Sequence, residues 1–255
     1  MISRSVGDKI YFFSDCHLGS RRHEDMRGVE KRVVAFLDSI KHDAKEIYIL
    51  GDLLDYWYEY RHVVPKGFVR IFGKLAEITD SGIKVTLITG NHDMWTFGYL
   101  SSELGIEVAH KPIVRELFGK RFFLAHGEGL GPVPVMERLM LSVFRSKICQ
   151  RMFSAVHPRW TVPFAFGWSS KNRGKHPIAS PYLGKDKEPL MLFAKDNLAQ
   201  CKEPIDYYLF GHRHIELRDF VEAEGRKAEV VVLGEWYSAC SYAVFDGKTL
   251  EMRRF

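Results

Sequence analysis

The stretch Leu87-Ile88-Thr89-Gly90-Asn91-His92-Asp93 decides the fold, because an apolar run leads directly into a cluster of polar side chains. The run predicts a buried β-strand, and Gly90 permits a tight turn at its end. Residues that follow such a strand lie at the carboxyl edge of a sheet, where α/β proteins bind ligands. The stretch therefore predicts a functional loop at a strand end.

Four other short motifs occur in the same setting, each directly after a β-like run. The runs cover residues 9–14, 46–50, 121–124 and 207–210, and the motifs are Asp15-x-His17, Gly51-Asp52-x-x-Asp55, His126-Gly127 and Gly211-His212-x-His214. Since the carboxyl ends of parallel strands meet at one edge, five such loops can bring distant residues together.

Helical patterns separate the first three strands. Residues 24–42 and 68–81 carry apolar side chains at helical spacing, and Gly82 is suited to end the second helix. The order β-α-β-α-β favours parallel strands with helices packed outside. Residues 113–117 predict one more strand, and residues 216–255 predict antiparallel sheet.

The interval 128–204 differs from the rest of the chain. Met136, Met140 and Phe144 share one helical face and Met152 lies on another, which predicts two short helices with a break near Ser146. A stretch rich in Pro, Gly and Ser follows. We expect a core formed by residues 1–127 and 205–255, with 128–204 as an inserted helical cap that binds substrate.

Charge is unevenly distributed. The net charge is +5, yet residues 132–186 hold nine basic residues against two acidic ones. A basic segment can face nucleic acid, an anionic membrane or an anionic substrate, or be a solvated face. The four cysteines form no C-x-x-C pair, and no secretory signal is recognisable, so a cytoplasmic location is expected.

The five motifs together predict a metal site. Asp offers a hard anionic oxygen, His a neutral imidazole nitrogen and Asn a carbonyl oxygen, a donor set typical of mixed N/O coordination. Any one motif alone would indicate only a turn or a surface pair. All five in order indicate a two-metal centre, in which ions roughly 3.5–4 Å apart clamp a phosphoryl group.

This ordered set, from Asp15 to His214, resembles the pattern of the calcineurin-like metallophosphoesterases. The resemblance implies an α/β fold (α+β by some schemes), a four-layer α-β-β-α sandwich with the cap inserted. It implies two divalent metal ions, with Mn²⁺ favoured. The implied ligands are Asp15, His17 and His214 on one ion, Asn91, His126 and His212 on the other, and Asp52 as the bridge.

In that family the histidine of Gly-Asn-His-Asp is not a ligand. The resemblance implies that His92 donates a proton to the leaving oxygen, or stabilises it, and that Asp55 holds His92. A carboxylate partner makes physical sense, because it raises the pKa of a histidine and fixes its tautomer.

Longer stretches resemble the UDP-2,3-diacylglucosamine pyrophosphatases of lipid A synthesis; they are residues 12–19, 51–57, 90–95, 126–132, 153–158 and 168–173. This resemblance implies a UDP-linked glycolipid substrate, hydrolysed to UMP and 2,3-diacylglucosamine 1-phosphate. It also implies peripheral contact with the inner face of the inner membrane. The candidate substrate contacts in the cap are Lys171, Arg173, Ser169 and Ser170, whereas Trp57 and Trp95 are expected to pack near the site.

Two alternatives stay open. Another metallophosphoesterase, such as a cyclic nucleotide phosphodiesterase, a protein phosphatase or a nuclease, would use the same ligands. A non-catalytic scaffold would keep the fold alone. Nucleic acid is not expected as a partner, because the cap lacks a recognisable binding module and its methionines suit acyl chains better.

Overall fold

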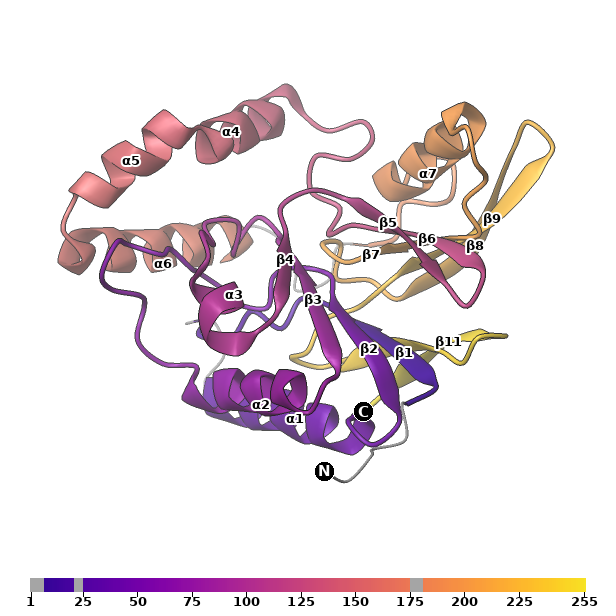
Figure 1. The fold of residues 1–255 in the computed structure, drawn as a ribbon. Coiled ribbons are helices and arrows are strands. Elements are labelled where there is room, and N and C mark those ends of the chain that lie inside the picture. Colours follow the sequence, from indigo (N-terminus) through magenta and orange to yellow (C-terminus); the bar gives the residue numbers. More distant parts are fainter. Residues whose placement is uncertain (1–6, 21–24, 175–180) are drawn as a thin grey trace.

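The computed structural model describes residues 7–20, 25–174 and 181–255 (Figure 1). For residues 168–174 it describes the main chain only. The first part of the chain forms β1 (Lys9–Phe13), α1 (Met26–Ile40), β2 (Ala44–Ile49), α2 (Val69–Asp80), β3 (Lys84–Ile88), α3 (Tyr99–Leu104), β4 (Glu107–Ala109), β5 (Ile113–Leu117) and β6 (Lys120–Leu124). The second part forms α4 (Val135–Arg145), α5 (Lys147–Ala155), α6 (Pro158–Gly174), α7 (Pro189–Gln200), β7 (Tyr207–Phe210), β8 (Leu217–Ala223), β9 (Arg226–Val232), β10 (Ser241–Phe245) and β11 (Leu250–Arg254).

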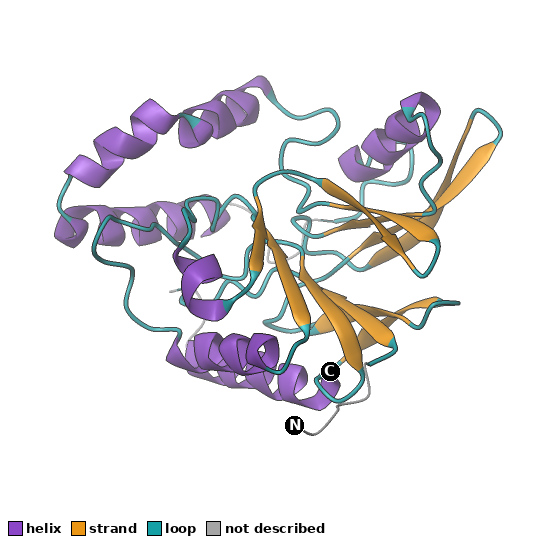
Figure 2. Ribbon diagram, in the orientation of Figure 1, coloured by secondary structure: helices purple, strands orange, loops and turns teal. Residues whose placement is uncertain are grey.

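The strands form two mixed sheets that pack face to face (Figure 2). The first has the order β11-β10-β1-β2-β3-β4, in which β1 to β4 are parallel and β10 is antiparallel to β1. The second has the order β5-β6-β7-β9-β8, in which β6, β7 and β9 are parallel. Parallel strands therefore occupy the middle of both sheets.

Alternation along the strands builds the layers. Phe12 points between the sheets and stacks on Phe122, with ring centroids 5.6 Å apart, whereas Phe13 points outward and meets Phe36 of α1. In β7, Leu209 belongs to the core between the sheets and Tyr208 to the core beneath α7. Successive strand side chains face opposite sides, so three cores separate four layers. The predicted α-β-β-α sandwich is confirmed.

The helical patterns of the sequence correspond to α1 and α2, and all five apolar positions expected inside α1 are buried. The tail differs from the expectation of an antiparallel sheet. The hairpins β8–β9 and β10–β11 are antiparallel, but they join different sheets, and β9 is also parallel to β7. Local alternation predicts a strand but not its neighbour, which long-range packing selects.

The cap helices, defined here as α4, α5 and α6, extend away from the sheets (Figure 1). Ser146 separates α4 from α5, as predicted, and its hydroxyl accepts a hydrogen bond from the Cys149 amide. The first part of the Pro/Gly/Ser-rich stretch, up to Gly174, forms α6 in spite of Pro163. Although α7 lies within 128–204, it packs on the second sheet through Leu190 and Leu198.

Candidate metal centre

The seven predicted ligands follow the carboxyl ends of five strands. Three of them, β1, β2 and β3, are parallel neighbours in the first sheet, and the other two, β6 and β7, are parallel neighbours in the second. The closest group joins the first and last motifs of the chain. His214 Nε2 lies 3.1 Å from Asp15 Oδ1 and 3.1 Å from His17 Nε2. Two imidazole nitrogens and a carboxylate oxygen directed at one point form a cation-binding arrangement.

Asp52 lies between this group and a second one. Its Oδ2 is 3.5 Å from His17 Nε2 and 3.3 Å from His126 Nε2. His212 stands beside His126, with ring centroids 5.1 Å apart. The carboxylate of Asp52 thus faces nitrogens of both groups.

Main-chain carbonyls orient two imidazoles. His126 Nδ1 donates to the Leu50 carbonyl at 2.7 Å, and His92 Nδ1 donates to the Asp55 carbonyl at 2.7 Å. A carbonyl only accepts, so Nδ1 carries the proton in both rings and Nε2 faces the centre.

The role of the Asp55 carboxylate differs from the expectation. Its Oδ1 is 4.0 Å from His92 Nδ1 but 3.5 Å from His17 Nδ1. His92 is therefore held by the main chain of Asp55 rather than by its side chain. The carboxylate instead supports His17, whose Nε2 faces His214.

Backbone conformation marks the site independently. Nine non-glycine residues among the described ones have a positive φ, and five of them are predicted ligands: Asp15 (55°), His17 (42°), Asp52 (52°), His212 (67°) and His214 (53°). This region of φ is unfavourable for such residues, by about 1–3 kcal/mol each, and persists where surrounding contacts over-determine it. Such strain concentrates at functional sites.

Close backbone approach explains one glycine of the deciding stretch. A Cβ at Gly90 would overlap Asp52 Oδ1. The loops of β2 and β3 can therefore meet only if this position lacks a side chain.

Ser14 and Asp93 hold the loops and were not singled out as site residues from the sequence. Ser14 Oγ donates to Asp15 Oδ2 at 2.6 Å, and the amide of His212 donates to the same oxygen at 2.9 Å. The buried Asp93 accepts from the amides of Gly90 (2.7 Å) and Leu53 (2.9 Å). Its place within Gly-Asn-His-Asp was the available signal.

Buried polar atoms of the proposed ligands support cation binding at this site. Asp15 Oδ1, Asn91 Oδ1 and His126 Nε2 are buried and form no hydrogen bond of good geometry. Asp15 Oδ1 nevertheless lies 3.1 Å from His214 Nε2, and His126 Nε2 lies 3.3 Å from Asp52 Oδ2. Buried polar atoms normally have a partner, and ligand atoms of Asp15, Asp52 and His126 lie within 4.8 Å of one another, so this group is suited to bind a cation.

The pKa values of the proposed ligands are shifted by burial and by their charged neighbours. Burial would raise the pKa of Asp15 and Asp52, but neighbouring histidines hold both pKa values well below the ordinary range. Burial and the adjacent His126 lower the pKa of His212 to about 3. Ionised carboxylates and a neutral imidazole are the forms that bind metal. At His126, burial lowers the pKa but is outweighed by Asp52, which raises it, so that metal binding at His126 would release a proton.

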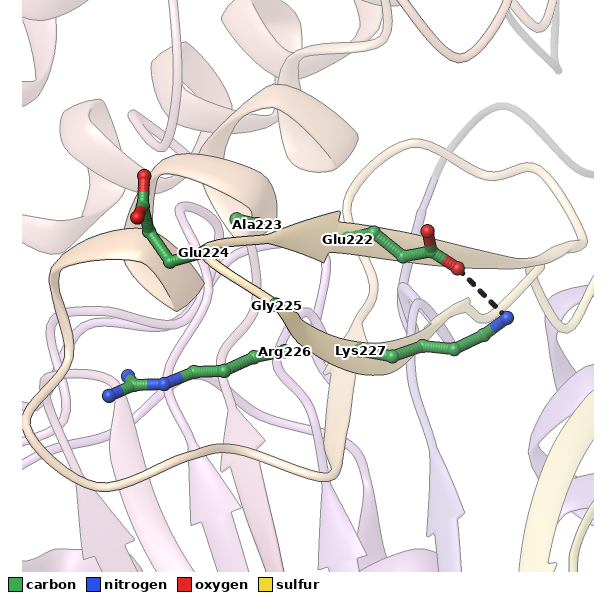
Figure 3. A pocket seen from close by; sticks show the side chains of 6 residues that line it. All are labelled: Glu222, Ala223, Glu224, Gly225, Arg226 and Lys227. Carbon is green, nitrogen blue, oxygen red and sulfur yellow. Dashed lines mark ion pairs between the residues drawn. The ribbon is translucent and has the colours of Figure 1, made fainter.

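The predicted cap contacts Lys171, Arg173, Ser169 and Ser170 have side chains outside the described residues. A hollow at the turn of the β8–β9 hairpin, bordered by the Glu222–Lys227 ion pair of 3.0 Å, contains no member of the metal centre (Figure 3). It is formed by one turn of chain and contains no histidine.

Residues 8–216 match the family described as calcineurin-like phosphoesterase, so the chain belongs to this family and is a metal-dependent hydrolase. The UDP-2,3-diacylglucosamine hydrolase of Porphyromonas gingivalis (strain ATCC BAA-308 / W83) is 44% identical over 254 residues, covering 95% of each chain. The protein of the same name from Vibrio vulnificus (strain CMCP6) is 27% identical over 252 residues, covering 96% of this chain and 97% of the relative. The solved structure of Yfce, a phosphoesterase from E. coli, matches with a TM-score of 0.46 at 18% identity, covering 96% and 92%.

Proposed function

We propose that this protein hydrolyses the pyrophosphate bond of UDP-2,3-diacylglucosamine and releases UMP and 2,3-diacylglucosamine 1-phosphate. One observation carries the proposal: a relative named for this substrate shares 44% identity over nearly the whole chain, cap included. We infer the type of reaction from the family, and the substrate from the relative that matches nearly the whole chain.

In this proposal Asp15, His17 and His214 hold one divalent ion and Asn91, His126 and His212 the other, while Asp52 bridges them. The support is that Asp52 Oδ2 faces His17 Nε2 and His126 Nε2, one from each group. When bound, two such ions neutralise phosphoryl charge and acidify water. Mn²⁺ is the ion that we infer from the N/O donor set and the family.

We assign His92 the role of proton donor rather than ligand, although it also lies in a group with His17 and Asp55 that could hold a metal ion. Its Nε2 lies 4.0 Å from Asp52 Oδ2, and its ring is partly exposed. Because the Asp55 carbonyl holds Nδ1–H, Nε2 is the atom that would protonate or stabilise the leaving phosphate oxygen. The buried Asp55 carboxylate keeps His17 oriented meanwhile.

The cap helices supply the surface for an acylated, anionic substrate. Met136 is 71% exposed and Met152 is 68% exposed, in a segment that also carries Arg138, Arg145 and Arg151. Apolar side chains interleaved with cations suit acyl chains and anionic headgroups. We infer peripheral contact with the inner face of the inner membrane, and phosphate contacts from Lys171, Arg173, Ser169 and Ser170. Among the described residues no helix is both long and apolar enough to cross a bilayer.

The test is incubation of the purified protein with UDP-2,3-diacylglucosamine and Mn²⁺, followed by detection of UMP. Parallel reactions contain a cyclic nucleotide and a DNA duplex with free ends, and a His126→Ala variant serves as the metal-centre control. We expect UMP release by the wild type alone. Turnover of the cyclic nucleotide or of DNA without UMP release would select another metallophosphoesterase activity.

A further inference from the structure

Two of the loops that carry metal-centre residues continue directly into contacts with the cap helices. The loop after β2 carries Tyr58, and the loop after β3 carries Trp95. The two loops are joined by main-chain hydrogen bonds, from the Trp57 amide to the His92 carbonyl (3.2 Å) and from the Glu59 amide to the Trp95 carbonyl (3.1 Å). The position of His92 and the position of these aromatic side chains are therefore linked through short stretches of chain.

Both aromatic side chains bind carbonyls of the cap. Trp95 Nε1 donates to the Phe144 carbonyl at 2.8 Å, and Tyr58 Oη donates to the Gln150 carbonyl at 2.7 Å. Phe144 lies in the last turn of α4, where carbonyls have no partner within the helix. The core thus supplies hydrogen bonds on both sides of the break at Ser146.

Ring contacts surround these hydrogen bonds. Phe153 of α5 lies 4.8 Å from Trp95 and 5.1 Å from Tyr58 between ring centroids, and Phe144 lies 5.7 Å from Trp95. All nine residues of α5 are described and none is buried, while α4 buries only Leu141. With so little core of their own, α4 and α5 depend on this junction for their position.

The loop after β2, which carries Tyr58, also contacts α6. Tyr60 is hydrogen-bonded to Thr161, and Tyr56 packs on Phe166 with centroids 5.5 Å apart. The loop after β2 therefore contacts α5 and α6, starting at Tyr56, four residues after Asp52, whereas α4 rests on Trp95 in the loop after β3.

We propose that Tyr58 and Trp95, together the cap dock, are specificity-determining positioning residues that hold the cap helices where an acylated substrate is selected. The proposal rests on the function proposed above, since it assigns the cap to the lipid part of the substrate. Neither residue touches the reacting atoms. The dock acts through α4 and α5, so its loss affects substrates that need the cap and spares those that need only the metal centre.

The experiment uses conservative variants that remove only the donors, Tyr58→Phe, Trp95→Phe and the double variant. The matched control is Tyr182→Phe, the same change at an exposed position outside the cap helices. Two quantities are measured on the full chain: amide hydrogen exchange in residues 135–155, and steady-state kinetics with UDP-2,3-diacylglucosamine and with bis(p-nitrophenyl) phosphate. A variant that fails to fold is replaced by Gln150→Met, which removes the second donor to the Phe144 carbonyl from the cap side.

For each lost donor, exchange in α4 and α5 should quicken by about fivefold, the effect of one net hydrogen bond. KM for the acylated substrate should rise by a similar factor, while turnover of bis(p-nitrophenyl) phosphate stays within about twofold. Unchanged exchange in the double variant, or an equal loss with both substrates, would overturn the dock. Absence of UMP release by the wild type would instead reject the proposed function, and the exchange data would still decide the dock.

Discussion

The metal centre and the cap helices are built in opposite ways. Four side chains of the metal centre are almost fully enclosed, among them Asp15 (0% exposed) and Asp52 (2%), while Asn91, His212 and His214 are partly buried, and five strands lead into the loops that carry them. In the cap helices large apolar side chains are exposed, among them Val135, Met136 and Ile148. The loops of the metal centre are held by many contacts, whereas the cap helices are held by few.

We propose that this difference assigns the hydrolysis reaction to the metal centre and the choice of substrate to the cap helices. A dinuclear centre needs ligand atoms held within fractions of an ångström, which the ends of buried parallel strands provide. A lipid-binding surface needs area and adaptable side chains, for which exposed methionine is suited. Changes in the centre should therefore affect every phosphoester, and changes in the cap only those with acyl chains.

The largest effect is expected from Asp52→Ala. Loss of the carboxylate that faces both histidine groups should lower turnover of all phosphodiesters by at least about 10⁴-fold, because several kcal/mol of charge stabilisation depend on the bound ions. Metal content measured by mass spectrometry should fall in parallel. Asp196→Ala, at an exposed position on α7, is the control. Substantial activity in Asp52→Ala would show that the centre is not the site of chemistry.

His92→Ala should cost less, about 10²- to 10³-fold in kcat, the range for removal of a general acid. Both metal ions should stay bound, since Nε2 of this ring is proposed to face the leaving group. Metal analysis and kinetics on the same sample test this, with the exposed His62→Ala as the matched variant. Metal loss from His92→Ala would make it a ligand and disprove the assignment.

Asp93→Asn should lower metal affinity by about 10- to 100-fold, because this residue supports the loops rather than the ion. One of its two amide partners, Gly90 or Leu53, would lose its acceptor, at a cost of about 1–3 kcal/mol in unfolding free energy. Calorimetric titration with Mn²⁺ and thermal denaturation measure the two effects. The exposed Asp80→Asn should change neither. Unaltered affinity would mean that the loops are held without Asp93.

The smallest effect is expected from Met136→Ser combined with Met152→Ser. Stability should change by no more than about 0.5 kcal/mol per residue, because both side chains are exposed. KM for UDP-2,3-diacylglucosamine should rise about three- to tenfold through lost apolar contact, with bis(p-nitrophenyl) phosphate unaffected. Val69→Ser, equally exposed but on α2, is the control. If the double variant bound the acylated substrate normally, the separation of chemistry from selection would fail.

The sequence alone predicted the strand β3, the two outer helices α1 and α2, the break at Ser146 and the four-layer sandwich. The strand, the helices and the break follow from periodicity, which is a local property of the chain, whereas the sandwich is what the family resemblance of the ordered motifs implies. Motif order also predicted that five loops could gather, because the carboxyl ends of parallel strands lie at one edge of a sheet, while the assignment of the seven ligands comes from the family resemblance and stays a prediction. Helix α6 was missed since Pro163 and its neighbours obscured the period.

Only the tertiary structure decided how distant groups pair. It determined that the carbonyl of Asp55, and not its carboxylate, holds His92. It separated the two C-terminal hairpins into different sheets. It also placed Trp95 against the end of α4, a contact across 49 positions in the chain. The physical reason is that periodicity reports which face of an element is buried, whereas the partner atom depends on packing between elements that are remote in sequence.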